Sequence, residues 1–230
     1  MRKFLDFPEA RNEIKRDLAE LGIKVHPETM QDKHIADNPD FDTRELQNYA
    51  YEVLKPDYSE VEGTHDEWVT QEWADRLQGG LNPGRAWKLR SEVWDQFLER
   101  SKPKMPGRFS YTYSERMGGV YLRSIVEELK IHPNSRQLYL PMWSQQTDWR
   151  RRGKRRVPCS LGYWFVMREN RLHLTYMMRS CDLYTHYAND VALATIMQAW
   201  VAKESGYDMG TFTHFIGSLH VYAKDVADVF

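Results

Sequence analysis

Apolar side chains recur every three to four residues in the first half of the chain, which is the pattern of amphipathic helices. The first such stretch, 8–21, ends at Gly22, a residue typical of helix C-caps. A second, 42–54, has Asp42 or Thr43 as its N-cap and a proline just beyond its end. Two further helices are expected, over 68–77 and 87–100.

The second half mixes the strand pattern with the helix pattern. The polar pair Asn170-Arg171 separates two segments rich in aromatic and β-branched residues, as in a β-hairpin. The stretch 191–205 is apolar nearly all round and ends at Gly206, which predicts a buried helix. We therefore expect an α+β fold with a substantial sheet, in a single domain over 1–230. The expected elements are helices over 119–129 and 191–205 and strands over 137–143, 161–168, 172–178 and 211–222.

Composition narrows the class of protein. The chain has 230 residues, of which 41% are hydrophobic, enough for one domain with a real core. A net charge of −1 and a pI of about 6.7 give no overall attraction to nucleic acid or anionic membranes. With 2 cysteines, no apolar run of membrane-spanning length and no apolar signal core, we expect a reduced cytoplasmic protein without membrane association.

Cys159 is the first candidate for chemistry. It follows Pro158 at the start of an expected strand, and Arg155, Arg156 and Arg179 could favour its thiolate, the nucleophilic form. Taken alone, a cysteine of this kind is more often a small buried apolar residue. Its surroundings in the sequence change that interpretation.

Several short motifs follow Cys159 in a fixed order. Arg-Ser-x-Asp occupies 179–182, Ala-Asn-Asp occupies 188–190 and Gly-x-x-His-x-Tyr occupies 217–222. Together with Pro-Cys at 158–159 they resemble the thymidylate synthase superfamily, over roughly 42–230. The resemblance implies a large mixed β-sheet flanked by helices and an obligate homodimer formed through the sheet.

The resemblance also implies how a nucleotide is held. Cys159 corresponds to the nucleophile that attacks C6 of the pyrimidine. Arg179 and Ser180 correspond to residues that hold the 5′-phosphate, for which the planar fork of arginine is well suited. Arg136 corresponds to an arginine that reaches the partner subunit's phosphate. His220 and Tyr222 correspond to the pair that hydrogen-bonds the sugar 3′-hydroxyl.

Further residues correspond to proton-transfer and cofactor positions. Glu45, in the helix expected over 42–54, resembles the family's catalytic glutamate and is our general acid/base candidate; the alternative is a solvated helix glutamate. Tyr113 resembles an active-site tyrosine and Trp94 a tryptophan placed against the folate, with core packing as the alternative for both. Asp182 corresponds to the carboxylate that accepts from the pterin. His186 stands near the folate, where the family commonly has glycine.

Asp190 is the most informative departure from the synthases. They carry asparagine eight residues after the aspartate of Arg-Ser-x-Asp, and a carboxamide can both accept from uracil N3–H and donate to O4. An ionised Asp190 instead accepts from the amino group of cytosine, and from N3 if that atom is protonated. Asn189 is adjacent, and if it were the base reader the substrate would be a uracil nucleotide.

Three features most resemble the bacteriophage deoxycytidylate hydroxymethylases: the Asn-Asp pair at 189–190, the run Gly-Ser-Leu-His-Val-Tyr at 217–222, and Met178 before Arg179. The resemblance implies that dCMP is the substrate, that 5,10-methylenetetrahydrofolate is the cofactor, and that water addition gives 5-hydroxymethyl-dCMP. The alternatives are a dCMP methyltransferase, a CMP hydroxymethylase and a dUMP-using thymidylate synthase. A family member that binds nucleotide or RNA without catalysis is the non-enzymatic alternative.

The basic run 150–156 is the remaining feature. We interpret it as a solvated loop between strands rather than as a nucleic-acid site. It could also attract the nucleotide phosphate or the polyglutamate tail of a folate.

Overall fold

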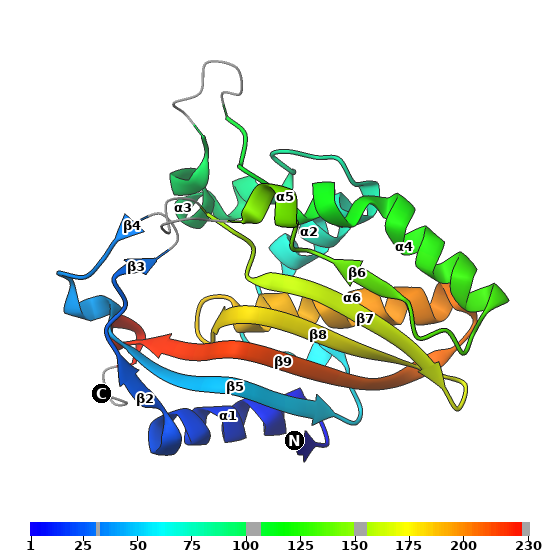
Figure 1. Cartoon of the computed structure of the whole chain (residues 1–230), viewed down its shortest axis with the longest axis horizontal. Coiled ribbons are helices and arrows are strands. Elements are labelled where there is room, and N and C mark those ends of the chain that lie inside the picture. Colours follow the sequence, from blue (N-terminus) through cyan, green and yellow to red (C-terminus); the bar gives the residue numbers. More distant parts are fainter. Residues whose placement is uncertain (31–32, 100–106, 150–155, 227–230) are drawn as a thin grey trace.

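A twisted mixed β-sheet is the main feature of the computed structural model, which describes residues 1–30, 33–99, 107–149 and 156–226 (Figure 1). The strand order is β1-β5-β9-β8-β7-β6, with β2 also paired to β5. The β8–β9 pair is parallel, whereas β5–β9 and β7–β8 are antiparallel. The strands of this sheet are β1 (Arg2–Phe4), β2 (Ile23–Val25), β5 (Thr43–Val53), β6 (Tyr139–Pro141), β7 (Ser160–Arg168), β8 (Arg171–Asp182) and β9 (Asp208–Tyr222).

Helices and short 3₁₀ turns lie around the sheet (Figure 1). A separate two-stranded sheet pairs β3 (Thr29–Met30) with β4 (Lys33–His34). The helices are α1 (Phe7–Leu21), α2 (Asp66–Gln78), α3 (Ser91–Trp94), α4 (Tyr113–Ile131), α5 (Gln145–Asp148) and α6 (Tyr187–Ser205). Short 3₁₀ turns are η1 (Pro39–Phe41), η2 (Tyr58–Glu60), η3 (Ala86–Arg90), η4 (Asp95–Phe97) and η5 (Ala223–Asp225).

Helix α6 lies at the centre of the core. It packs against β8 and β9 on one side and against α2 and α4 on the other, so nearly every side of it is buried. This explains its apolar sequence and confirms the buried helix expected there. Gly206 ends the helix in the left-handed conformation, with φ 82°, which glycine adopts without strain. The helix expected over 8–21 is confirmed as α1, and that over 68–77 as α2.

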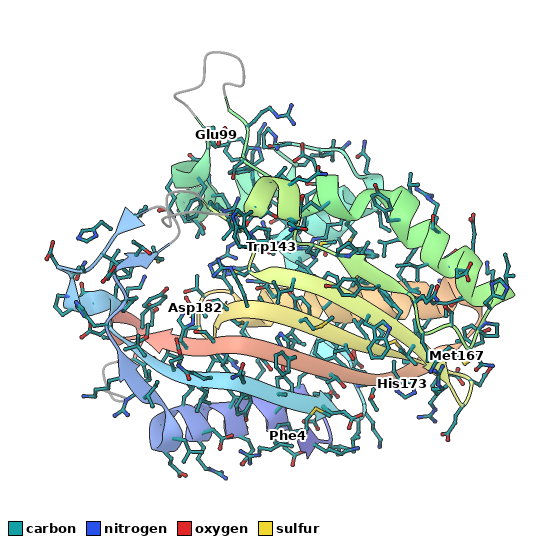
Figure 2. All side chains as sticks on the ribbon, in the orientation of Figure 1. Phe4, Glu99, Trp143, Met167, His173 and Asp182 are labelled. Atoms are coloured by element: carbon teal, nitrogen blue, oxygen red, sulfur yellow. The ribbon has the colours of Figure 1, made fainter. Side chains whose placement is uncertain are left out.

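The expected hairpin is confirmed as β7 and β8. Its turn lies at Glu169 and Asn170, both with positive φ, one residue earlier than the sequence indicated. The last strand is confirmed as β9 and begins three residues earlier than expected. Figure 2 shows His173 and Asp182 near opposite ends of β8, and the candidate site lies at the Asp182 end.

The helix expected over 42–54 is wrong, because this segment is strand β5. It pairs with β9 from Thr43 to Val53, and the buried Tyr51 lies opposite His214. Local N-cap and proline signals favoured a helix, but pairing with a strand more than 150 residues away in the sequence decided the conformation.

The segment expected as one helix over 87–100 is a series of short turns: η3, α3 and η4. Asp75, fully buried on α2, accepts hydrogen bonds from the backbone N–H groups of Arg85 and Ala86 and fixes the start of this segment. The breaks let Trp87 and Trp94 both contact Phe109. Two other bounds also differ, since α4 starts six residues before the expected helix and β6 is shorter than the expected strand.

Candidate active site

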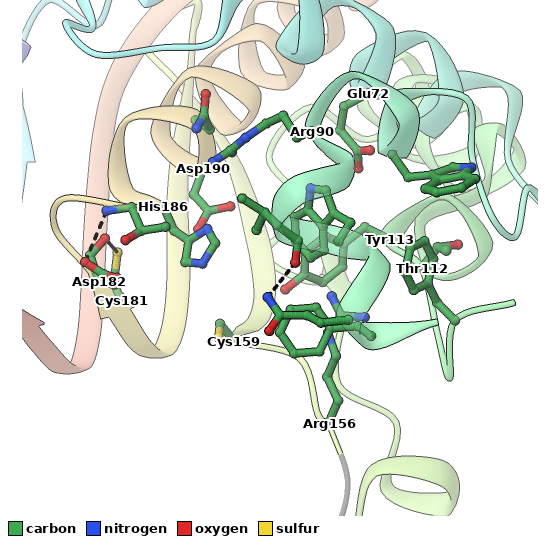
Figure 3. Close-up of a pocket in the computed structure, with 18 of the residues that line it drawn as sticks. Glu72, Arg90, Thr112, Tyr113, Arg156, Cys159, Cys181, Asp182, His186 and Asp190 are labelled. Carbon is green, nitrogen blue, oxygen red and sulfur yellow. Dashed lines mark hydrogen bonds between the residues drawn. The ribbon is translucent and has the colours of Figure 1, made fainter. Parts of the chain in front are cut away.

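A pocket of about 410 Å³ lies where the ends of β8 and β9 meet α2, α6 and the short turns around α3 (Figure 3). It brings together most of the residues expected to carry the chemistry. Those are Tyr113, Cys159, Arg179, Ser180, Asp182, His186, Asp190, His220, Tyr222 and Trp94. Segments from residue 94 to residue 222 therefore converge on one cavity.

Cys159 stands just before β7, with its sulfur next to a guanidinium group. Arg179 Nη2 lies 3.7 Å from Cys159 Sγ, and its Nε donates to Pro158 O at 2.8 Å. Burial raises the pKa of the thiol above its usual value, while the charges of Arg179 and Arg156 act in the opposite direction. The arginines therefore act as expected from the sequence, but burial outweighs them. Arg155 lies outside the described residues.

Asp190 projects from the first turn of α6 into the pocket (Figure 3). Burial raises the pKa of its carboxyl group to about 7. The guanidinium groups of Arg76 and Arg90 counteract this rise, and the carboxylate of Glu72 adds to it. Asp190 is thus a buried carboxyl group that changes charge near neutral pH.

Asn189, the alternative base reader, is engaged elsewhere. Its Oδ1 accepts a hydrogen bond from the backbone N–H of His65 at 2.9 Å, at the N-terminus of α2. The side chain also borders the pocket, but its carbonyl oxygen is used in joining α6 to α2.

Glu45 lies outside the pocket, contrary to its expected place in the active site. It is on β5, where Oε2 accepts from Ser218 Oγ at 2.6 Å and Oε1 accepts from Gln47 Nε2 at 3.2 Å. The error follows from the wrong helix assignment, since the family's glutamate was sought on a helix.

Glu72 is a glutamate of the pocket that the sequence reasoning did not single out. It comes from α2 and lines the pocket, and Figure 3 shows it among the lining side chains together with Asp190. Burial raises the pKa of Glu72, and Arg76 opposes this effect. Sequence reasoning could have found Glu72, because it lies one helical turn after Trp68 on the helix that was correctly expected over 68–77.

Arg76 was also missed by the sequence analysis. Its side chain is 3% exposed, and Nε donates to Glu72 Oε1 at 2.8 Å. The guanidinium carbon lies 5.0 Å from the centre of the Tyr113 ring. Tyr113 OH in turn accepts from the backbone N–H of Ser160, the residue after the nucleophile, at 3.2 Å. A buried ion pair, an aromatic ring and the Cys159 segment are thereby connected.

Aromatic rings form one wall of the pocket. The Trp94 ring stacks on the Trp68 ring with their centres 6.3 Å apart. The centre of the His186 ring lies 6.2 Å from that of Trp94. The Arg156 guanidinium lies 5.2 Å from the Trp94 ring and 4.5 Å from the Tyr111 ring. Burial lowers the pKa of His186 to about 4, so this imidazole is neutral at neutral pH.

Asp182, His220 and Tyr222 lie together at the ends of β8 and β9. Asp182 Oδ1 accepts from the backbone N–H groups of Tyr184 and Thr185 at 3.0 and 3.1 Å, which orders the turn into α6. His220 and Tyr222 are alternate residues of β9, and their rings meet edge to face at 5.1 Å. Burial lowers the pKa of His220.

Arg136 lies away from the pocket. It is exposed in the loop after α4, and its carbonyl oxygen accepts from Trp164 Nε1 at 3.1 Å. Of the basic run, 150–155 lies outside the described residues, and Arg156 lines the pocket.

The described residues meet the requirements of neither a metal site nor a membrane-spanning helix. Within these ranges, no group of three or more His, Cys, Asp or Glu side chains is arranged to hold a metal ion. None of the helices described above combines the length and apolar character that crossing a membrane requires.

The fold and site define a class of protein: an α+β protein with a cysteine nucleophile candidate in a pocket built from cations, carboxylates and aromatic rings. The profile of the thymidylate synthase family matches residues 64–230, well over half of the chain. The chain belongs to the thymidylate synthase family. The match contains Glu72 and begins after Glu45.

Individual relatives are similar over a shorter region. The thymidylate synthase of Symbiobacterium thermophilum is 32% identical over 91 residues, which is 40% of this chain and 31% of that protein. The thymidylate synthases of Oenococcus oeni and Leuconostoc mesenteroides are 27% and 28% identical over 106 residues, 46% of this chain and 32% of each relative. The matched region thus spans about a third of the length of these relatives. The thymidylate synthase family uses 5,10-methylenetetrahydrofolate as its one-carbon donor.

Proposed function

We propose that this protein transfers a one-carbon unit to C5 of dCMP and, by addition of water, forms 5-hydroxymethyl-dCMP. The observation that carries the proposal is the placement of Asp190 in the same buried pocket as Cys159. A carboxyl group at this position can serve as an acceptor for the amino group that distinguishes cytosine from uracil.

Covalent catalysis begins at Cys159. The thiolate bonds to C6 of the pyrimidine, and the electron pair of the C5–C6 bond becomes available at C5 for attack on the one-carbon unit. Loss of the C5 proton, with tetrahydrofolate as the leaving group, gives an exocyclic methylene on the nucleotide; water adds to this methylene, and expulsion of the Cys159 sulfur from C6 restores the ring. Arg179 and Arg156 favour the thiolate against the effect of burial.

Glu72 is the proposed group for proton transfer, in place of Glu45. It lines the pocket, and its position on α2 is fixed by the ion pair with Arg76. A carboxylate there can accept a proton from the water that adds to the exocyclic methylene of the nucleotide. Tyr113, bonded to the backbone next to Cys159, is proposed to order the nucleophile's segment.

The remaining pocket residues are proposed to hold the nucleotide. Arg179 and Ser180 would bind the 5′-phosphate, and His220 and Tyr222 the sugar hydroxyl. Arg136 is proposed to reach the phosphate of a second subunit, since it is exposed and remote from its own pocket.

The pocket residues fit a folate. Stacked rings of Trp94 and Trp68 offer a flat apolar wall, and the buried Trp94 Nε1 has no hydrogen-bond partner within the described residues. Asp182 adds a carboxylate acceptor at the pocket's edge, and His186 adds a neutral ring next to Trp94. When bound, 5,10-methylenetetrahydrofolate supplies the one-carbon unit; these four residues would orient it against the base.

A second candidate is a dUMP-using thymidylate synthase. It is favoured by the relatives' names and by the Asp190 pKa of about 7, because a protonated carboxyl group donates and accepts as asparagine does. The dCMP methyltransferase and CMP hydroxymethylase share the same pocket and differ in product or sugar.

The test is to incubate the protein with 5,10-methylenetetrahydrofolate and dCMP, CMP or dUMP and to identify each product by mass. We expect a gain of CH₂O on dCMP, and no product from Cys159→Ala. Turnover of dUMP with none of dCMP would overturn the proposal in favour of the second candidate. An absorbance rise from dihydrofolate, with a gain of CH₂, would identify a methyltransferase. Nucleotide or RNA binding that survives Cys159→Ala, with no turnover, would identify a non-enzymatic protein.

A further inference from the structure

Arg76 is a buried cation that the assignments above leave without contact to substrate. It lies one helical turn after Glu72 on α2, its side chain is 3% exposed, and it lines the pocket. An ionised guanidinium in such a place is costly unless its N–H groups find acceptors.

One of those groups has a partner in the protein. Nε donates to Glu72 Oε1 at 2.8 Å, and this is the hydrogen bond that the Arg76 side chain makes within the described residues. Its guanidinium lies over the face of Tyr113, which also lines the pocket. Among the described residues, the terminal Nη1 and Nη2 groups donate to no protein acceptor and so can donate to a ligand.

Arg76 also acts on Asp190. Burial is the main cause of the raised pKa of Asp190, and among the surrounding charges the Arg76 guanidinium is the strongest in opposing it, ahead of Arg90. Glu72 and Asp182 act in the opposite direction. Arg76 and Asp190 also line the same pocket, and their helices, α2 and α6, pack against each other, so the two side chains can contact one ligand from two elements.

The two side chains have opposite hydrogen-bonding character. Ionised Asp190 offers only acceptors, and Arg76 offers only donors. Cytosine presents a donor at its amino group and an acceptor at N3, whereas uracil presents an acceptor at O4 and a donor at N3. A carboxylate beside a guanidinium thus matches the edge of cytosine and opposes the edge of uracil at both atoms.

We propose that Arg76 is a specificity-determining residue that donates a hydrogen bond to N3 of the pyrimidine while Asp190 accepts from the amino group. The inference rests on the proposed use of dCMP. Glu72 holds the guanidinium in position through Nε, so the terminal nitrogens are fixed before the nucleotide arrives. With both contacts made, N3 and the amino group of neutral cytosine each face a hydrogen-bond partner of the complementary kind.

The test uses a nucleotide that lacks only the atom in question. Binding of dCMP and of 3-deaza-dCMP, in which C–H replaces N3, is measured by calorimetry on the full chain. Wild type should bind the 3-deaza analogue about 10- to 100-fold more weakly, the value of a hydrogen bond to a charged group. Arg76→Met should bind both nucleotides with equal affinity, and Arg76→Lys should retain part of the preference.

Arg116→Met is the matched control. Arg116 is a largely buried arginine of α4 that pairs with Asp148, and neither residue lines the pocket. This variant should keep the full preference for dCMP over its 3-deaza analogue. Thermal melting checks that each variant is folded, and Arg76→Lys provides the test if Arg76→Met is not.

Two outcomes separate the inference from the proposed function. If wild type binds dCMP and both Arg76 variants keep the full preference against the 3-deaza analogue, Arg76 is not the N3 contact, although use of dCMP stands. If wild type binds dUMP and not dCMP, the proposed function fails and this inference fails with it.

Discussion

Asp190 shows how burial sets the chemistry of single residues in this pocket. Its carboxyl group would be fully ionised at neutral pH in water, but burial raises its pKa to about 7. The same cause raises the pKa of Cys159 and lowers that of His186. The charge state of each group is therefore decided by its neighbours and its depth, neither of which is evident from its residue type.

Substrate choice should depend on pH because of Asp190. Below about pH 7 the protonated carboxyl group resembles asparagine and suits uracil, and above it the carboxylate accepts from the amino group of cytosine. The ratio of kcat/KM for dCMP to that for dUMP should rise about 100-fold from about pH 6 to about pH 8, because the ionised fraction rises about tenfold while the protonated fraction falls about tenfold. Competition assays across this range measure the ratio.

Asp190→Asn is the control for this effect. It should prefer dUMP at every pH and show a flat ratio. A wild-type ratio that falls with rising pH would contradict the assigned role of Asp190.

The two glutamates should differ sharply when replaced. Glu72→Gln removes the proton-transfer group but keeps an oxygen for Arg76, so kcat should fall about 100-fold or more. Glu45→Gln, a matched change on β5 away from the pocket, should leave kcat nearly unchanged. Steady-state kinetics of both variants provide the comparison, and equal losses would show that the pocket has been wrongly assigned.

At the scale of elements, helix α4 holds Tyr113 at its first residue. The helix is started by a capping box: Thr112 Oγ1 accepts from Glu115 N–H at 3.1 Å, and Glu115 Oε2 accepts from Thr112 N–H at 3.2 Å. Thr112 Oγ1 also donates to Leu81 O at 2.8 Å. The start of the helix is therefore joined to the loop that follows α2.

Thr112→Ala should lower the free energy of unfolding by about 1–2 kcal/mol, the usual cost of losing an N-cap. Urea denaturation followed by circular dichroism measures this. Ser124→Ala, which removes an exposed hydroxyl group from the same helix, should change stability by less than about 0.5 kcal/mol. Similar losses of unfolding free energy in both variants would show that the Thr112 cap does not stabilise the helix.

Four neighbouring strands share a buried ladder of rings. Tyr163, Tyr176, His214 and Tyr51 lie opposite one another across β7, β8, β9 and β5, with Tyr176 stacked 4.8 Å from His214. His214 Nδ1 and Tyr51 OH share a hydrogen bond of 3.0 Å. Burial lowers the pKa of His214 to about 3.

This ladder should make the fold sensitive to acid. His214 stays neutral when folded but takes up a proton when unfolded below about pH 6.5, so the stability it contributes is lost as pH falls. Between about pH 6.5 and pH 3, wild type should lose about 1.4 kcal/mol per pH unit more than His214→Gln does. Denaturation at several pH values measures the difference, and parallel curves would contradict this account.

At the scale of the whole molecule, the face of the sheet that points away from the core carries exposed apolar residues. Trp164 is 38% exposed, Phe215 is 43% exposed and Tyr139 is 44% exposed. Trp164 and Phe215 alternate with the buried Phe165 and Ile216 and so lie on the opposite face of the sheet. Figure 1 shows α6 lying behind the sheet, and α6 packs against β8 and β9 on the core side.

We expect this face to form a homodimer, as the family resemblance implies. Light scattering should give twice the mass of the chain for wild type and a single mass for the double variant Trp164→Glu, Phe215→Glu. Arg136→Ala should remain dimeric and raise KM for dCMP, since it is proposed to bind the phosphate held by the partner. A monomeric wild type would overturn both expectations.

Much of the site could be predicted from the sequence because its residues occur in short motifs. Pro-Cys at 158–159, Arg-Ser-x-Asp at 179–182 and the residues up to Tyr222 specify both side chains and spacing, and the structure brings them into one pocket. Helices α1, α2 and α6 and the hairpin β7–β8 were also evident, because their apolar periods and end signals are local. Motifs and end signals of this kind depend on residues that are close together in the sequence, so they can be recognised without the structure.

Only the tertiary structure decided the rest. Residues 42–54 became strand β5 because β9 offered a partner, and Glu45 on this strand lies outside the pocket that Glu72 lines. The pairing of Arg76 with Glu72, and the effect of both on Asp190, depend on α2 and α6 meeting the ends of the strands. Long-range pairing and burial act between segments far apart in the chain, and for that reason no local pattern could reveal them.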